Sequence, residues 1–315
     1  GLIAILALGL ALRLYMSAKA FYSTFDTSTV GLMAIHIREG ELPLFYYGQN
    51  YMGALEAYTS AVMFTIFGIS TFSLSLAPIF FALGWILATY LLFTKLYGQR
   101  GGFAAALCVA VPGWYGLWFS TGSYGGYSVL YFLGTLFIYF NLLAERSLKQ
   151  HTLWFLSLGM GCVFGLGIWT NLQILSYLAT GCLILLALLV KNRFDRKLLF
   201  PFSIAAIIGL SGFIPFILSL QYCAFGSRTM NSPSIHYVLG TLGIMTRTLP
   251  KFILWPAHNS VITATMITIC LVPPLFLYLY RLTKKDVRKT GRLYIPVIFC
   301  MVFLVLFLPH PMAAL

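Results

Sequence analysis

Four of the seven acidic residues in this 315-residue chain fall in one stretch, from Phe25 to Glu56. They are Asp26, Glu39, Glu41 and Glu56. A carboxylate held beside a reacting hydroxyl can act as a general base. Carboxylate oxygens can also hold a divalent cation. The stretch from Phe25 to Glu56 is therefore where the sequence predicts chemistry.

Each of these acids also has a purely structural interpretation. Asp26 precedes Thr-Ser-Thr-Val, where an aspartate suits a helix N-cap as well as a general base, and the two roles are compatible. Glu56 either faces solvent on a surface helix or turns into a cleft to bind a sugar hydroxyl or a divalent ion. Glu39 and Glu41, on either side of Gly40, are interpreted as solvated.

No cofactor is established by the sequence, and a divalent ion stays open through Glu56 alone. His36 has no partner at metal-ligand spacing, so no metal-ligating residues are predicted. Tyr47 and Gln49 are predicted to bind substrate. Tyr46, Tyr47 and Tyr51 also fit the aromatic belt that lies at a membrane surface.

A second group of candidates lies late in the chain, in a long segment at about 221–258. Arg228, Arg247 and Lys251 are cations that fit phosphate binding, since arginine matches phosphate oxygens bidentately. Lipid headgroups are the alternative partner. Arg247 and Lys251 are four residues apart and share a face if that piece is helical.

The elements that must position these residues are membrane helices. The chain is 60% hydrophobic and 9% charged, with a mean hydropathy of +0.90, which excludes an ordinary soluble domain. Its net charge of +13 does not indicate nucleic acid, because Lys and Arg lie mostly in connectors between apolar runs. We predict an all-α polytopic bundle with about nine spans, at 1–18, 72–94, 101–119, 126–144, 152–169, 172–190, 199–220, 259–280 and 293–309.

Charge decides the status of the short apolar segment 53–67. If this segment lies on the membrane surface, 14 of the 20 basic residues fall on the inner side, as the positive-inside rule requires. If it crosses, the same residues fall outside. We therefore predict a first outer loop at 21–71 with two juxtamembrane helices, one after Asp26 and one at 53–67, joined by an irregular link. Arg13, inside the first span, is expected to face a polar cavity or to reach outward.

Two segments resemble a known family: Asp26-Thr-Ser-Thr-Val-Gly-Leu-Met-Ala, and Gly40-Glu-Leu-Pro-Leu-Phe-Tyr-Tyr-Gly-Gln-Asn-Tyr-Met-Gly-Ala-Leu-Glu-Ala-Tyr. They resemble the first outer loop of bacterial family-39-type glycosyltransferases of the GT-C membrane superfamily, which are similar to protein O-mannosyltransferases and to the lipid A aminoarabinose transferase. A later helix that ends in Lys95-Leu-Tyr-Gly-Gln-Arg also matches. The resemblance covers about residues 1–120 and is architectural afterwards. Many relatives have Asp-Glu where this chain has Asp26-Thr27.

The resemblance implies a single transmembrane domain over 1–315, expected to be part of a longer protein. It implies transfer of a sugar from a polyprenyl-phosphate donor to an unidentified acceptor, with Asp26 as the base. Arg228, Arg247 and Lys251 would help to bind the carrier phosphate. The implied location is the bacterial inner membrane among its lipids, with the first loop on the periplasmic side.

The alternative function is a non-catalytic, degenerate subunit of a larger membrane complex. A transporter is less favoured, because no paired charged or Gly/Pro-broken segments occur at mid-membrane positions.

Overall fold

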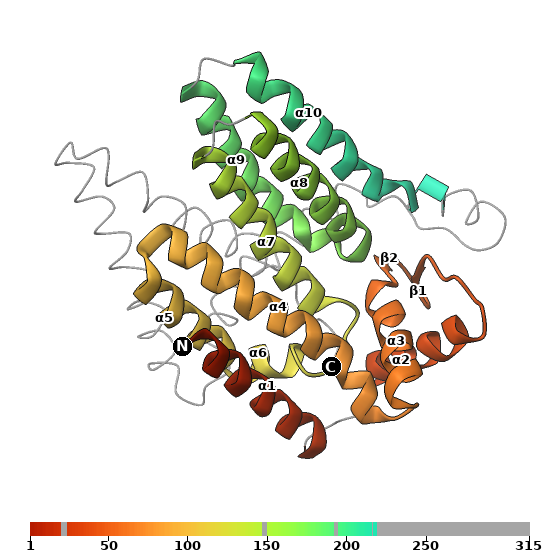
Figure 1. The fold of residues 1–315 in the computed structure, drawn as a ribbon. Helices are drawn as coiled ribbons and strands as arrows, with labels where there is room; N and C mark the ends of the chain where they lie inside the picture. Colours follow the sequence, from red (N-terminus) through yellow and green to blue (C-terminus); the bar gives the residue numbers. More distant parts are fainter. Residues whose placement is uncertain (20–23, 147–149, 192–194, 216, 219–315) are drawn as a thin grey trace, which may run out of the picture. The chain divides into compact units, whose positions relative to one another are not determined.

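The computed structural model describes residues 1–19, 24–146, 150–191, 195–215 and 217–218, within the first of two compact units, Gly1–Ala224. The predicted loop at 221–258 and the predicted spans at 259–280 and 293–309 lie outside the described residues. A single domain over 1–315 stays a prediction. The described part is a helical bundle with one small hairpin, which confirms the all-α prediction (Figure 1).

The helices pack in a continuous series. Their bounds are α1 Leu2–Lys19, α2 Phe25–Arg38, α3 Leu55–Phe67, α4 Thr71–Tyr97, α5 Gln99–Ala110, α6 Trp114–Phe119, α7 Tyr127–Arg146, α8 Gln150–Thr170, α9 Leu175–Lys191 and α10 Arg196–Leu210. Helix α4 contacts α1, α3, α5 and α7, while α7 contacts α8 and α9, and α8 contacts α10. Small residues permit the close approach between α8 and α10, since a Cβ on Gly161 would come within 2.8 Å of the Ala205 carbonyl oxygen.

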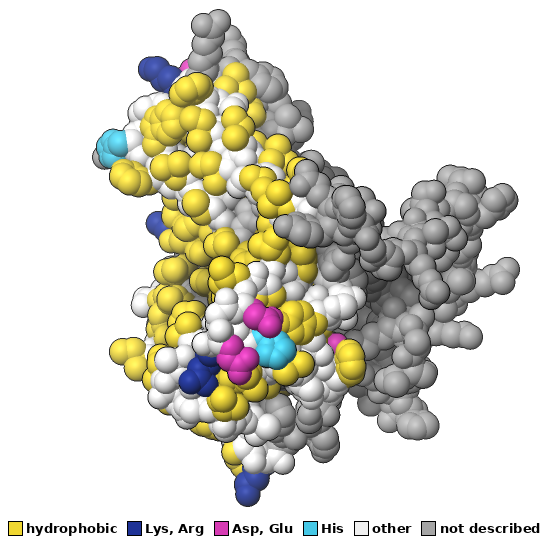
Figure 2. Space-filling view, turned by 90° about the vertical axis from the view of Figure 1, so that its right-hand side faces the viewer, with side chains coloured by type: hydrophobic (Ala, Val, Ile, Leu, Met, Phe, Trp, Pro, Cys, Tyr) yellow, Lys and Arg dark blue, Asp and Glu magenta, His cyan; other side chains and the backbone are white. Residues whose placement is uncertain are grey.

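The exterior of this bundle is apolar, as a lipid-facing surface must be. Ile3 and Phe25 are each 83% exposed, and Phe155 is 75% exposed. Figure 2 shows hydrophobic side chains covering most of one described face, with only a few charged groups among them. The protein is therefore an integral membrane protein.

The prediction of nine spans is not confirmed. Four helices in the described residues have the length and composition to cross a bilayer: α1, α4, the 127–144 part of α7, and α8. The predicted span at 101–119 was wrong as a continuous helix, because it divides into α5 and α6 around Pro112. Proline lacks a backbone N–H and disfavours the helical conformation of the residue before it, here Val111 with φ −118° and ψ 70°.

Arg13 caps the end of α5 that this break creates. Its side chain is fully buried, and its guanidinium donates to the carbonyl oxygens of Val109 and Ala110 at 3.0 Å each. It also donates to the Gly9 carbonyl at 3.1 Å and to Ser120 Oγ at 3.0 Å. A cation at a helix C-terminus also interacts favourably with the helix dipole. The expectation that Arg13 faces a cavity or reaches outward was therefore wrong.

The first outer loop contains the two predicted helices, α2 and α3. Val30, Met33 and Ala34 recur at helical spacing on α2 and are fully buried against the alanine-rich face of α3. The prediction of an irregular link between them was wrong. In the link, β1 (Phe45–Tyr46) and β2 (Gln49–Gly53) form an antiparallel hairpin. Gly48, with φ +79°, provides the positive φ that its two-residue turn requires.

Two further connectors meet this hairpin and α3 at one end of the bundle. The backbone N–H of Gly126, before α7, donates to the Glu56 carboxylate. Asn171, after α8, forms a β-bridge with Met52, and Trp169 Nε1 donates to the Leu44 carbonyl at 2.8 Å. Successive connectors of a membrane bundle lie on alternate sides of the membrane. The predicted spans place these connectors on the same side as the first outer loop, as the structure does. Which side of the membrane this end faces stays a prediction.

Gly53 is the tightest of these contacts. A Cβ on Gly53 would lie 2.4 Å from the Trp169 carbonyl oxygen, a backbone atom that cannot rotate away. We expect Gly53→Ala to destabilise the protein by about 1–3 kcal/mol, as overpacking does. Gly113→Ala is the control, because a Cβ on Gly113 would meet nothing within 4 Å. Thermal unfolding in detergent measures both, and equal midpoints would contradict the close contact.

Candidate functional site

Asp26 lies in the first turn of α2 with its side chain partly exposed. It is not the N-cap of that helix. Thr24 is the cap, and its hydroxyl and that of Thr27 form a capping box with the backbone N–H groups. The Asp26 carboxylate is therefore not needed to begin the helix, and within the described residues it forms no ion pair. A partly exposed, unpaired carboxylate is available to accept a proton.

Two tyrosines from different elements lie near Asp26. The buried Tyr46, in β1, donates its hydroxyl proton to the Asp26 backbone carbonyl at 2.7 Å and lies 3.5 Å from Oδ1. Burial raises the pKa of Tyr46, and the charges of Asp26 and Glu56 raise it further. Burial and the charge of Asp26 also raise the pKa of Tyr124, in the connector before α7, to about 12. Both phenols therefore stay protonated beside Asp26 at neutral pH.

Glu56 is buried in the first turn of α3. Its side chain is 2% exposed, and its carboxylate accepts the N–H of Gly126. Burial raises the pKa of Glu56 to about 7, while the backbone N–H groups of Gly126 and Gly125 partly offset this rise. The structure therefore excludes the solvated interpretation of Glu56 and turns this acid inward. Its role in substrate binding stays a prediction.

This burial makes the protein's stability depend on pH. The folded state holds a proton on Glu56 between about pH 4.5 and 7 whereas the unfolded chain does not, so stability falls as pH rises through this interval. We expect wild type to lose about 3 kcal/mol relative to Glu56→Gln between pH 5 and pH 8. Unfolding midpoints in detergent measure this difference. Glu39→Gln, which changes an exposed acid, is the control, and the same trend in both variants would contradict the assignment to Glu56.

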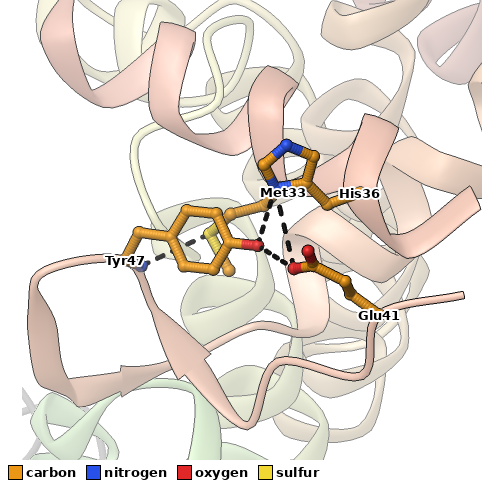
Figure 3. A network of polar contacts seen from close by, with 4 residues as sticks. All are labelled: Met33, His36, Glu41 and Tyr47. Carbon is orange, nitrogen blue, oxygen red and sulfur yellow. Dashed lines mark hydrogen bonds and ion pairs between the residues drawn. The ribbon is translucent and has the colours of Figure 1, made fainter. Parts of the chain in front are cut away.

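A separate polar network lies at the other end of α2 (Figure 3). Tyr47 donates its hydroxyl proton to Glu41 Oε2 at 2.7 Å, so His36 Nδ1, at 3.0 Å, donates to the Tyr47 hydroxyl oxygen. Burial and Glu41 raise the pKa of Tyr47 to about 12. Glu41 is exposed to solvent, and its carboxylate accepts the hydrogen bond from Tyr47. His36 is ten residues from Asp26, about 15 Å along the helix axis, so this network is not part of the Asp26 group.

Gln49, which was also predicted to bind substrate, begins β2 with its side chain partly exposed. It pairs with Tyr46 across the hairpin. Arg228, Arg247 and Lys251 lie outside the described residues. No group of three or more His, Cys, Asp or Glu side chains suited to a metal ion occurs in the described part of the chain. The Glu56 carboxylate accepts the Gly126 N–H, and a divalent ion at this acid stays a prediction.

Sequence reasoning missed Tyr124 and underestimated Tyr46. Tyr46 was grouped with the membrane-surface aromatics, whereas its hydroxyl donates to the Asp26 backbone carbonyl of α2. The only signal for Tyr124 was its place before Gly125-Gly126 in a polar connector. Both glycines have positive φ, at +79° and +97°, so the backbone there adopts a conformation that favours glycine.

Comparison with known proteins gives a fold. No protein-family model matches the chain, and no curated protein does. ArnT from Cupriavidus metallidurans, in its apo state, is similar with a TM-score of 0.54 at 14% identity, over 97% of this chain and 59% of its own. The Archaeoglobus fulgidus oligosaccharyltransferase, in complex with Zn and sulfate, is similar with a TM-score of 0.54 at 16% identity, over 96% of this chain and 45% of its own.

This chain therefore spans less than two thirds of either protein. At these identities the likeness establishes the fold, and it is the fold that the resemblance of the first outer loop implied.

Proposed function

We propose that this chain, which has the fold of GT-C membrane glycosyltransferases, transfers a sugar from a polyprenyl-phosphate donor to an acceptor hydroxyl. The observation that carries the proposal is the placement of Asp26. Its carboxylate is partly exposed and free of ion pairs in the described residues, and it lies beside two protonated tyrosines where the outer loop meets the helix bundle.

In this mechanism Asp26 accepts the proton of the acceptor hydroxyl as its oxygen attacks C1 of the sugar. The bond from C1 to the phosphate oxygen breaks, and polyprenyl phosphate leaves with the electron pair. Arg228, Arg247 and Lys251 are assigned to this phosphate, because cations there would stabilise the negative charge that develops in the transition state.

The protonated hydroxyls of Tyr46 and Tyr124 are assigned to orienting the sugar. A phenol that stays neutral can donate a hydrogen bond to a sugar oxygen, and burial holds both groups in that state. The prenyl chain of the donor would lie along the apolar exterior of the bundle. We assign the protein to the bacterial inner membrane with the site on the periplasmic side.

The test is donor turnover by wild-type protein in liposomes. Polyprenyl-phosphate mannose, glucose and aminoarabinose are supplied in turn with a membrane extract as the source of acceptor, and release of polyprenyl phosphate is measured. We expect release from at least one of these donors and none of the matching nucleotide from GDP-mannose or UDP-glucose. No release from any lipid donor would favour the non-catalytic subunit instead.

A further inference from the structure

The connector between α6 and α7, Ser120–Gly126, carries Tyr124, whose pKa the charge of Asp26 raises. We name this connector the rim loop. It is held at both ends by long-range contacts. Ser120 Oγ accepts a hydrogen bond from Arg13 Nε at 3.0 Å at its start, and Gly126 N–H donates to Glu56 at its end. Between them, the Ser123 hydroxyl donates to the Leu74 carbonyl at 3.3 Å. The loop is thus tied to α1, α3 and α4.

The contact with Glu56 differs from the others because it ties the rim loop to the outer loop. Glu56 lies in the first turn of α3, directly after the hairpin. Gly125 packs under the same hairpin, since a Cβ there would lie 2.0 Å from Met52 Cε and 3.7 Å from Tyr46 Cδ2. The buried carboxylate therefore joins the segment that carries Tyr124 to the segment that carries Tyr46.

Hydrogen bonds from backbone N–H groups to a carboxylate are strong and directional. Losing these donors would be costly, because the buried charge would be left without compensation. The Gly126 N–H also immediately precedes α7, where the helix dipole favours a negative charge. This geometry fixes the backbone of the rim loop against α3. By contrast, the hydroxyl of Ser60, one turn later on α3, is buried and has no hydrogen-bond partner among the residues that the structure describes.

We infer that Glu56 is a positioning residue, whose carboxylate holds the rim loop so that Tyr124 stays near Asp26 and Tyr46. The inference rests on the proposed function for its catalytic consequence, but the tether itself does not. Glu56 does not contact the reacting atoms in this role. It acts through the backbone of Gly125 and Gly126.

Hydrogen–deuterium exchange of the whole protein in detergent at pH 8 tests the tether without any substrate. In Glu56→Gln the amide keeps the size of the side chain but presents one oxygen and no charge to the donors of the rim loop. We expect amide exchange in peptides covering 120–126 to become at least about tenfold faster. Ser60→Ala, a change at a buried polar position of the same helix, should leave this exchange unchanged. Unchanged exchange in Glu56→Gln would overturn the inference.

Kinetics of lipid-donor turnover in liposomes test the consequence. We expect kcat of Glu56→Gln to fall about tenfold or more, with KM for the donor changed by less than about twofold, because misplaced orienting groups slow the chemical step. Faster exchange with unchanged kcat would overturn the positioning role. Absence of turnover in wild type would instead contradict the proposed function, and the exchange measurement would still decide whether Glu56 tethers the rim loop.

Discussion

Asp26→Asn is expected to lower kcat for sugar transfer by about 10²–10⁴-fold, the usual contribution of a general base. Asparagine has the same shape but cannot accept the acceptor's proton. KM for the lipid donor should change little, because residues other than Asp26 bind the phosphate and the prenyl chain in the proposed mechanism. The fold should persist, since Thr24 and not Asp26 caps α2.

Turnover in liposomes measures this effect, with Glu39→Gln as the matched control. Glu39 ends the same helix, is exposed, and is removed from the Asp26 group by the length of α2. Its variant should keep the wild-type rate. Equal rates in Asp26→Asn and wild type would remove Asp26 from the role of base. Equal losses in both variants would point to a general effect of lost charge.

Arg13→Leu is expected to have the largest effect on stability, about 2–6 kcal/mol, because two buried acceptors lose their donor. The change leaves the carbonyl groups of Val109 and Ala110 at the end of α5 without their donor, inside a bundle where no other donor to them is present in the described residues. Each buried acceptor left without a partner costs about 1–3 kcal/mol. The stability of Arg13→Lys should lie between those of wild type and Arg13→Leu, because one ammonium cannot reach all four acceptors of the guanidinium.

The control for this prediction lies at the other end of α5. Arg100 is exposed, and Arg100→Leu should change stability by less than about 0.5 kcal/mol. Unfolding midpoints in detergent and the yield of folded protein compare the two. If Arg13→Leu is as stable as Arg100→Leu, the buried guanidinium contributes no net stabilisation.

Much of the helical architecture could be predicted because each long span is an uninterrupted apolar run. The ends of α4 and α8 fall within three residues of the predicted spans at 72–94 and 152–169. The failure at 101–119 has a local cause, since Pro112 sits inside an apolar run and composition does not reveal a break there. The hairpin was missed because strands of two and five residues are too short to show alternation.

The site was only partly predictable, because most of it depends on contacts between distant parts of the chain. Asp26 was one of four clustered acids, and the family resemblance singled it out as the predicted base. The orientation of Glu56 was not, because α3 is apolar almost all round and its periodicity does not reveal which face turns inward. Tyr124 reaches Asp26 only through the folding of α4 to α6 between them, which no local pattern encodes.

The most direct test of the central claim is to locate the polyprenyl-phosphate carrier on the protein. A polyprenyl phosphate that carries a photoreactive diazirine on the isoprene unit next to the phosphate is crosslinked to wild-type protein in liposomes, and the labelled peptides are mapped by mass spectrometry. Labels in the first turn of α2, in the hairpin around Tyr46 and in the rim loop around Tyr124, competed away by excess unlabelled polyprenyl phosphate, are the expected result. Labels confined to the opposite end of the bundle, near Lys95 and Arg100, would contradict the placement of the reaction at Asp26.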